Sequence, residues 1–294
     1  MSDGIKVLNF GSLNIDHVYQ VDHFVRPGET ILSKEYQLFF GGKGFNQSVA
    51  LARAGANVYH AGKVGDDGKS LLKECEKLHI KTDFIEVDST PSGHAIIQVD
   101  PSGENCILLY GGANQSIDSV YIDKILENFS EGDYLLIQNE ISSTDYLITQ
   151  AHKKGLKIVF NPAPMNEKVF AYPLELIDLF ILNETEAFEL SNEINVEQAI
   201  WNLKQKYSRA EIIITQGGKG VSFLQNNELK RVKALTVEVI DTTAAGDTFV
   251  GYFLSSLIKN ESLEEAITLG NKAASLAVQK SGASGSIPEI SEII

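Results

Sequence analysis

The segment DTTAAGDTF, residues 241–249, places two carboxylates among small residues and is the strongest candidate for chemistry in the chain. A helical pattern follows it, and small side chains at a helix start let an anion reach free backbone amides and the positive end of the helix dipole. We expect a phosphate to bind at the amides of Ala244, Ala245, Gly246 and Asp247. Asp247 could simply favour the helix dipole, but beside an anion it could also act as a base toward an attacking hydroxyl.

A second Gly-rich segment, GGKGFNQ at residues 41–47, comes directly before an apolar-periodic helix. Its glycines permit a tight turn, and Lys43 and Asn46 add donors on the first helical turn, where exposed amides could hold a ligand oxygen. A plain helix start after a turn explains these residues equally well. The segment is not a dinucleotide fingerprint, because Gln47 stands where the last Gly would be.

The segment GKVGDDGKS, residues 62–70, looks like a Walker A phosphate loop, but its spacing is wrong. Lys63 occupies the position of the first Gly, and the tight geometry of that loop makes one residue matter. Neither common nucleotide-binding loop is therefore predicted. The six His residues show no metal-ligand spacing, and no Gly-x-Ser-x-Gly elbow indicates a hydrolase.

Two more motifs follow strand ends. In NETEAFEL, residues 183–190, Asn183 can cap a helix and the acids favour its first turn. The same acids could instead lie near a hydrated Mg²⁺, which keeps several waters and needs only one or two carboxylates. ITQGGKG, residues 214–220, predicts two strands joined by a Gly turn, and it could also bring Thr215 and backbone amides to phosphates.

The elements that must position these motifs alternate along the chain. Short apolar runs indicate buried strands, and the amphipathic patterns between them indicate helices. Strands are predicted at 6–11, 134–138, 157–161, 179–183 and 211–216, with another strand-like run at 235–240, and helices at 43–54, 67–78, 144–154, 196–206, 247–258 and 262–280. This pattern is typical of an α/β protein with a mostly parallel central sheet and helices on both faces, where ligands bind at the carboxyl ends of the strands.

Two segments, 13–40 and 93–112, break this alternation with strand signals that have no helices between them. The second contains DPSGEN, a hairpin turn signal. We interpret the two as a small β-sheet lid over an α/β domain formed by 1–12, 41–92 and 113–294. An ordinary β-extension would give the same pattern.

Composition limits the function further. The formal charge is −14 (25 basic minus 39 acidic residues), which argues against nucleic acid and against anionic membrane surfaces as partners. No apolar run is long enough for a membrane helix, and the first residues lack the features of a secretion signal. Only Cys75 and Cys106 are present, which suggests buried thiols in a reducing cytoplasm.

Taken together, GSLNID, GGKGFNQ, NPAP, NETEA, ITQGGKG and DTTAAGDTF occur in the order and spacing of the ribokinase-like (PfkB) sugar kinases, and the resemblance covers essentially the whole chain. It implies a Rossmann-like domain with a β-sheet lid, a homodimer that pairs through the lids, and the use of ATP, Mg²⁺ and a monovalent cation such as K⁺.

The resemblance also implies residue roles. Asp247 would be the general base, with the anion hole formed by Ala244, Ala245 and Gly246. The sugar-binding positions would be Asn14, Asp16, Gly42, Lys43, Asn46, Glu140 and Asp247. The nucleotide site would comprise Asn183, Glu186, Thr215, Gly217, Gly220 and Asn271, with Glu186 contacting magnesium through water. The monovalent-cation site would comprise Asp241, Thr243, Ala277, Lys280, Gly282 and Ser286, mostly through backbone carbonyls.

The activity that the resemblance implies is ATP-dependent phosphorylation of D-ribose at its 5-hydroxyl. Kinase action on another sugar or nucleoside, such as deoxyribose, fructose or adenosine, is the main alternative. A catalytically inactive sugar or nucleotide sensor is a second one, but such a protein should lose the base or the anion-hole glycine, and Asp247 and Gly246 are both present.

Overall fold

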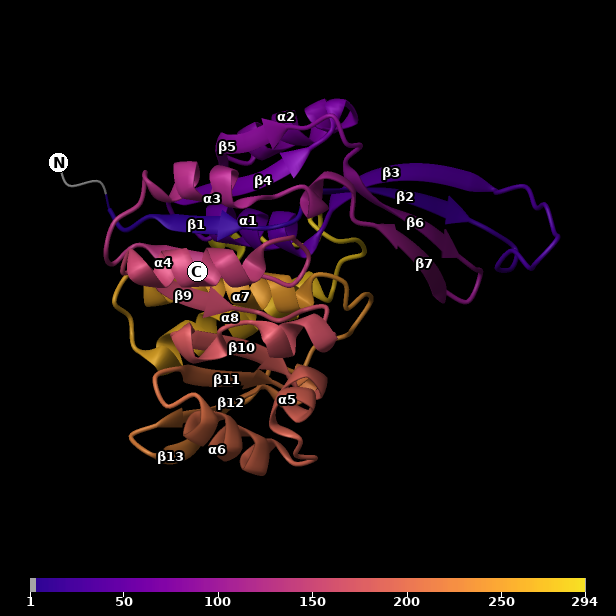
Figure 1. The fold of residues 1–294 in the computed structure, drawn as a ribbon. Helices are drawn as coiled ribbons and strands as arrows, with labels where there is room; N and C mark the ends of the chain where they lie inside the picture. Colours follow the sequence, from indigo (N-terminus) through magenta and orange to yellow (C-terminus); the bar gives the residue numbers. More distant parts are fainter. Residues whose placement is uncertain (1–3, 294) are drawn as a thin grey trace.

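The computed structural model describes residues 4–293, and these residues form two β-sheets with helices around the larger one (Figure 1). In the described residues the large sheet has nine strands, in the spatial order β13 (Glu228–Val232), β12 (Val221–Gln225), β11 (Glu211–Thr215), β10 (Leu179–Asn183), β9 (Lys157–Phe160), β8 (Tyr134–Ile137), β1 (Val7–Phe10), β4 (Val58–Val64) and β5 (Lys81–Val87). All neighbours from β11 to β5 pair in parallel, and only β12 and β13 run antiparallel. The mostly parallel sheet predicted from the sequence is confirmed.

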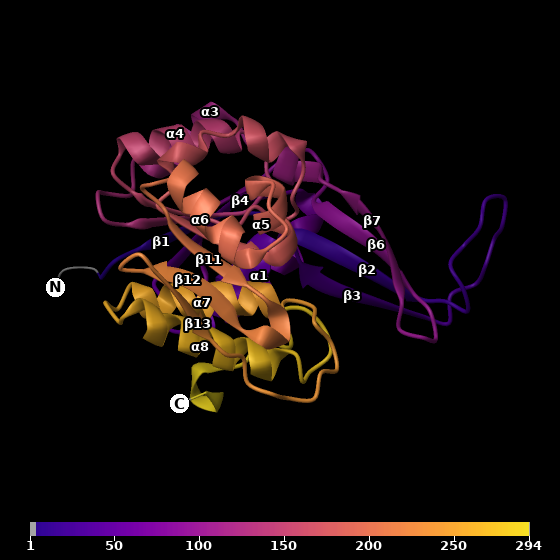
Figure 2. The same ribbon diagram turned by 90° about the horizontal axis from the view of Figure 1, so that it is seen from below.

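Helices cover both faces of this sheet (Figure 2). One face carries α1 (Lys43–Arg53), α2 (Lys69–Lys77), α7 (Ala245–Leu257) and α8 (Leu263–Ala277), and the other carries α3 (Ser119–Leu126), α4 (Thr144–Lys153), α5 (Glu184–Ser191) and α6 (Val196–Lys206). Because successive strand residues point to opposite faces, Val7 packs in one core and Leu8 in the other. Both faces are therefore buried, which explains the unbroken apolar runs of the central strands.

The second sheet projects from the large domain (Figure 1). Its four strands within the described residues lie in the order β3 (Glu35–Gly41), β2 (Asn14–Gln20), β6 (Gly93–Val99) and β7 (Asn105–Tyr110). The predicted turn at DPSGEN joins β6 to β7 as an antiparallel hairpin, with the Asp100 amide donating to the Glu104 carbonyl at 3.1 Å. We call this sheet the lid; its strands come from segments 13–40 and 93–112.

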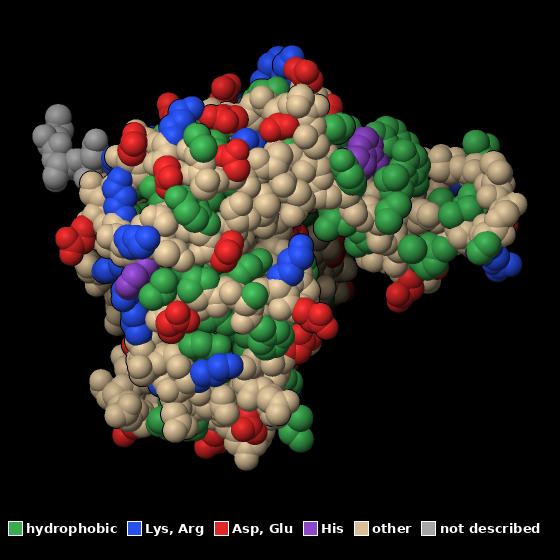
Figure 3. All heavy atoms as spheres, viewed as in Figure 1, with side chains coloured by type: hydrophobic (Ala, Val, Ile, Leu, Met, Phe, Trp, Pro, Cys, Tyr) green, Lys and Arg blue, Asp and Glu red, His purple; other side chains and the backbone are tan. Residues whose placement is uncertain are grey.

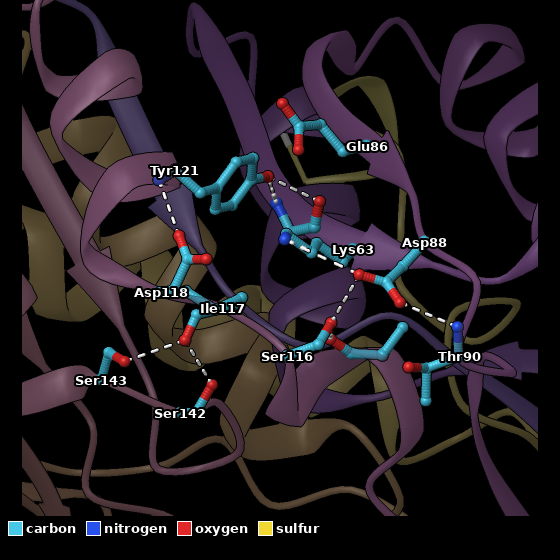
Figure 4. Close-up of polar contacts among 12 residues, drawn as sticks. Lys63, Glu86, Asp88, Thr90, Ser116, Ile117, Asp118, Tyr121, Ser142 and Ser143 are labelled. Atoms are coloured by element: carbon cyan, nitrogen blue, oxygen red, sulfur yellow. Dashed lines mark hydrogen bonds and ion pairs between the residues drawn. The ribbon is translucent and has the colours of Figure 1, made fainter.

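The segment 62–70, which resembles a phosphate loop but has the wrong spacing, contacts the base of the β6–β7 hairpin of the lid (Figure 4). Lys63, at the end of β4, lies 3.7 Å from Asp88, whose carboxylate accepts from the Thr90 amide (2.8 Å) and the Ser116 hydroxyl (3.0 Å). Asp67 accepts from the amide and hydroxyl of Ser92, directly before β6. These contacts tie the chain entering and leaving the hairpin to the large domain.

Two sequence expectations are wrong. The strand-like run 235–240 forms no strand: it is extended but has no sheet neighbour, and Leu235, Val239 and Ile240 are more than half exposed. Its apolar composition matches that of a strand, but composition does not supply a pairing partner. Of the two cysteines, only Cys75 is buried, while Cys106 is exposed on β7 of the lid.

Candidate functional site

The candidate site is a cavity of about 460 Å³ at the carboxyl ends of the parallel strands, under the lid. Lid strands, the start of α1, the loops after β8, β9 and β10, and the start of α7 all contribute to its wall. The predicted residues that line it are Asn14, Asp16, Gly42, Lys43, Asn46, Glu140, Asn183, Glu186, Thr215, Thr243, Ala244, Gly246 and Asp247. Motifs spread over more than two hundred residues thus meet in one place.

The start of α1 is held by a close backbone approach. Gly42 has φ of 90°, a left-handed conformation that favours Gly, and Gly44 lies so near the loop after β1 that an added Cβ would be 2.3 Å from the Ser12 amide. The Phe45 amide donates to the Ser12 carbonyl at 2.9 Å. This contact fixes the first turn of α1, which directs Lys43 and Asn46 into the cavity.

Asp247 lies in the first turn of α7 and is 7% exposed. Its Oδ2 accepts from Asn46 Nδ2 at 3.1 Å, and its Oδ1 accepts from Gln47 Nε2 at 2.9 Å. Burial raises the pKa of Asp247, while Lys43 and the two amides oppose that rise. The result is a buried carboxylate with fixed orientation at a helix N-terminus.

The small residues before Asp247 leave space beside the helix start. Ala244 adopts a left-handed conformation (φ 59°), and a Cβ added at Gly246 would have no protein atom within 4 Å. The Ala245 amide donates to the Thr242 carbonyl at 3.2 Å, so this amide already has a partner within the turn. The open space at Gly246 is where a phosphate could reach the helix N-terminus.

Polar side chains from the lid and the β8 loop face the other end of the cavity. Asn14 Oδ1 accepts from Asn114 Nδ2 at 2.8 Å, which leaves the Asn14 amide nitrogen free to donate. Glu140 Oε2 accepts from the Lys43 amide at 2.9 Å and from the Ser12 hydroxyl. Asn46 Oδ1 is buried without a hydrogen-bond partner, a state that costs free energy unless a ligand supplies a donor.

The cavity concentrates negative charge around one ammonium group. Burial raises the pKa of Asp16 to about 6, and Glu140 adds to the rise; burial likewise raises the pKa of Glu140. Burial alone would lower the pKa of Lys43, but the carboxylates of Asp247, Glu140 and Glu186 outweigh it and raise that pKa. Lys43 is therefore charged at neutral pH and faces a surplus of carboxylates.

The NETEA motif builds a capping box. The Asn183 side chain accepts from the Glu186 amide (2.8 Å), and Glu186 Oε2 accepts from the Asn183 amide (2.9 Å), as the helix-capping interpretation predicted. Glu186 is nevertheless only 5% exposed, and burial raises its pKa. Both residues line the cavity, so capping fixes the position of an acid that faces the ligand space.

Three predicted nucleotide residues lie outside the cavity wall. Gly217 and Gly220 form the turn between β11 and β12, both with positive φ. A Cβ at Gly220 would be 2.1 Å from the Val232 carbonyl oxygen, so that glycine is required by packing. The Asn271 side chain points to the carbonyls of Val232 and Lys233, joining α8 to the end of β13.

The predicted cation residues form two adjoining loops. Both carboxylate oxygens of Asp241 accept backbone amides, from Thr243 at 2.8 Å and from Gly282 at 2.9 Å. Burial would raise the pKa of Asp241, but these hydrogen bonds lower it below its usual value. Asp241 therefore joins the two loops as an anion. Within residues 4–293, Thr243 is the member of this set that lines the main cavity; Asp241, Ala277, Lys280, Gly282 and Ser286 are not part of the cavity wall.

Sequence reasoning missed several residues of the site. Asn161 and Ala163, from the NPAP motif, line the cavity, and Gln47 holds Asp247. Their motifs were recognised, but the spacing did not show which side chains point inward. In the part of the chain that the structure describes, no three His, Cys, Asp or Glu side chains gather as a metal cage would, and no helix is long and apolar enough to cross a membrane.

Comparisons with known proteins agree with this geometry. The model of the pfkB family of carbohydrate kinases matches residues 5–290. The chain belongs to this family. It is 38% identical to a ribokinase of Haemophilus influenzae, with 97% of this chain and 95% of that protein covered.

Two solved structures show the fold of this pfkB-family kinase in relatives. The ribokinase of Cryptococcus neoformans in complex with ADP superimposes with a TM-score of 0.88 at 32% identity, over 99% of each chain. The ribokinase of Arabidopsis thaliana, complexed with ribose and ATP, gives a TM-score of 0.86 at 26% identity, over 99% of this chain and 98% of that one. The chain is thus a carbohydrate kinase with the fold of that family, as the motifs predicted.

Proposed function

We propose that this carbohydrate kinase transfers the γ-phosphoryl group of ATP to the 5-hydroxyl of D-ribose. The observation that carries the proposal is the position of Asp247. It lies buried between polar donors from α1 and the open N-terminus of α7, inside one cavity. The names and ligands of the ribokinase relatives support ribose and ATP as the two substrates.

Asp247 is suited to act as the general base. A carboxylate whose pKa is raised by burial is a stronger proton acceptor than an exposed one, and its hydrogen bonds to Asn46 and Gln47 fix the direction from which it accepts. The sugar hydroxyl would give its proton to Asp247 as it attacks. The free amides at Gly246 and the α7 dipole would stabilise the charge on the transferred group.

The remaining cavity residues fit a small polyhydroxy sugar. Asp16 and Glu140 offer carboxylate acceptors, and Asn14 offers an amide donor, which suits pairs of vicinal hydroxyls. Above them the lid contributes the aliphatic side chains of Ala95, Ile97 and Ile107. Among the residues that line the cavity in the described chain none is aromatic, so a nucleoside base would find no stacking surface.

Glu186 and Asn183 fit a hydrated magnesium ion on the nucleotide side. Their oxygen donors suit Mg²⁺, which keeps several of its own waters and needs only one or two carboxylates. When bound with ATP, Mg²⁺ neutralises phosphate charge. Thr215, at the end of β11, would face the nucleotide from the same side.

Two further features belong to the proposal. A K⁺ ion would bind backbone carbonyls of the loops that Asp241 joins, with that carboxylate supplying the balancing charge.

Two copies would pair through their lids, because Tyr36, Leu38, Ile96 and Leu108 expose apolar surface there, visible as a hydrophobic patch in Figure 3.

The test is a panel of ribose, deoxyribose, fructose and adenosine with ATP and Mg²⁺, scored by ADP release. Ribose should give the highest kcat/KM. A higher value for another acceptor would overturn the choice of sugar and keep the kinase. Ribose and ATP binding with no ADP release from any acceptor would support an inactive sensor instead.

A further inference from the structure

Behind Asp247 a chain of buried polar side chains crosses the core between α1 and the large sheet. Its members are Gln47, Gln138, Asn9, Ser48 and His60, and none is more than 1% exposed. Gln138 Nε2 donates to Gln47 Oε1 at 2.7 Å and to Asn9 Oδ1 at 3.0 Å. Buried polar groups of this kind replace apolar packing and are costly unless every hydrogen bond is made.

Donor and acceptor chemistry fixes the direction of the hydrogen bonds in this polar network, although the Oε1 atom of Gln138 is buried without a hydrogen-bond partner. Burial lowers the pKa of His60 to about 4, so the ring is neutral, and its Nε2 must donate to the Gly11 carbonyl oxygen 3.2 Å away. Its Nδ1 then accepts from the Ser48 hydroxyl (2.8 Å), which in turn accepts from Asn9 Nδ2 (2.7 Å). Asn9 Nδ2 also donates to the Gly44 carbonyl at 2.7 Å, which fixes the Asn9 amide independently.

These directions determine how Gln47 presents itself to the base. Asn9 Oδ1 must accept, so Gln138 donates with its amide nitrogen to both Asn9 and Gln47. Gln47 Oε1 is therefore occupied, and its Nε2 can only point to Asp247 Oδ1 (2.9 Å) and Asn161 Oδ1 (3.0 Å). Asn161 is itself fixed, because its Nδ2 donates to the Ile181 carbonyl at 2.9 Å.

We infer that Gln47 is a positioning residue for the base, and that Gln138 prevents its amide from flipping. A flipped amide would turn an oxygen toward the Asp247 carboxylate and favour the protonated, inactive form. Held as it is, Gln47 stabilises the ionised form and occupies Oδ1, so Oδ2, held by Asn46, faces the acceptor hydroxyl. The inference rests on Asp247 being the base of the proposed reaction.

The charged groups that face Asp247 set the background for this effect. Lys43, from α1, favours its ionised form, whereas Glu140, from the loop after β8, and Glu186, from the first turn of α5, disfavour it. Replacing Gln47 leaves the charges of Lys43, Glu140 and Glu186 in place and removes one hydrogen bond that lowers the pKa of Asp247. The pKa of Asp247 should then rise. The rate falls at low pH as Asp247 becomes protonated, and this acid limb of the pH–rate profile should move to higher pH.

The experiment measures single-turnover rates with ribose, ATP and Mg²⁺ from pH 5 to 9 for the wild type, Gln47→Leu and Gln138→Leu. For Gln47→Leu we expect a roughly 10- to 100-fold slower rate at pH 7, KM values within about threefold, and an acid limb at least half a pH unit higher. Gln138→Leu, whose side chain does not touch Asp247, should move the limb in the same direction by less. Gln47→Asn, with a shorter amide, replaces Gln47→Leu if that variant does not fold.

Tyr121→Phe is the matched control. Tyr121 is buried, and its hydroxyl accepts from the Gly62 amide and donates to the Gly62 carbonyl in the separate polar cluster of Figure 4. This variant should lower the melting temperature and leave the limb in place. An unmoved limb in the Gln47 variant, or an equal shift in Tyr121→Phe, overturns the inference. If Asp247→Asn retains normal turnover, the proposed base fails instead, so the two failures are distinguishable.

Discussion

Asp16 should make the unliganded protein less stable at neutral pH, because its carboxylate is charged while buried under the lid beside Glu140. The side chain lies on β2, faces the cavity and is close to Glu140. Burial and that neighbour raise its pKa from 3.8 to about 6. We predict that Asp16→Asn stabilises the apo protein and weakens ribose binding.

The magnitude follows from the pKa. A rise from 3.8 to about 6 corresponds to an upper limit near 3 kcal/mol at pH 7, at 1.36 kcal/mol per tenfold change. Asp16 is partly exposed, and solvent screening reduces this to about 1–2 kcal/mol. For a chain of this size that is roughly 2–5 °C in melting temperature.

The direction of the pKa shift determines the pH range in which Asp16 destabilises the folded protein. Because the pKa of Asp16 is raised in the folded state, the cost is absent below about pH 4, develops between pH 4 and 6, and is fully present above pH 6. Asp16→Asn should therefore melt higher than the wild type at pH 7 and at the same temperature at pH 4. Ribose binding by the wild type should weaken about tenfold between pH 7 and pH 5, as the ionised fraction falls.

Thermal unfolding and ribose titration calorimetry, each across this pH range, test the prediction. Loss of one charge-assisted hydrogen bond should weaken ribose binding by about 1.5–3 kcal/mol, or roughly 10- to 150-fold. Asp83→Asn, on an exposed position of β5, is the control and should change neither quantity. A lower melting temperature for Asp16→Asn at pH 7, or a difference that does not depend on pH, would refute the reasoning.

Three other predictions concern the base, the cation and the lid. Asp247→Asn should bind ribose and ATP by calorimetry but turn over about 10²–10⁴-fold more slowly, and near-normal turnover would contradict its role as base. Activity should be higher in K⁺ buffer than in Na⁺-only buffer, because the loops joined by Asp241 would bind the larger ion; equal rates would exclude the site. Leu108→Glu places a charge on a residue of β7 that is 68% exposed and outside the cavity wall. Sedimentation should show this variant as a monomer and the wild type as a dimer, and equal masses would reject lid pairing.

Much of the architecture could be predicted because local pattern and fold agree. Continuous apolar runs at 134–138 and 211–216 became central strands, since both faces of a covered parallel sheet require apolar side chains. The run at 235–240 has the same composition and failed, because pairing depends on a neighbouring strand that composition does not specify. The strand Val58–Val64 was missed because its Gly and Lys residues resemble a loop, although it pairs with both β1 and the edge strand β5.

In the site, likewise, the sequence indicates which residue types are present but not the direction in which each side chain points. Asp247 and Asn46 could be predicted from their motifs, because each is a polar residue in the first turn of a helix that follows a Gly-containing segment. Such a position exposes backbone amides to a ligand. Gln47 lies next to Asn46 in the same motif, but only the structure shows that it is held by Gln138, which follows β8 directly and lies 91 residues later in the sequence. His94, by contrast, lies in the lid segment but packs against Tyr110, with ring centroids 5.0 Å apart and the rings tilted by 41°, and it is not part of the cavity wall.

The charges in the cavity explain how so acidic a protein can bind an anionic substrate. Four carboxylates, those of Asp16, Glu140, Glu186 and Asp247, line the same cavity as the ammonium group of Lys43, and burial raises the pKa of each of these acids. Each carboxylate is costly in the empty site, and each has a use once the ligands bind. In the proposed reaction the acids near the lid would accept hydrogen bonds from sugar hydroxyls, Glu186 would face hydrated magnesium, and Asp247 would accept a proton. Positive potential for the phosphates would then come from Lys43, from magnesium bound with the nucleotide, and from the N-terminus of α7, none of which changes the sign of the protein surface. The net charge of −14 therefore argues against extended polyanions as partners but not against one nucleotide bound in this cavity.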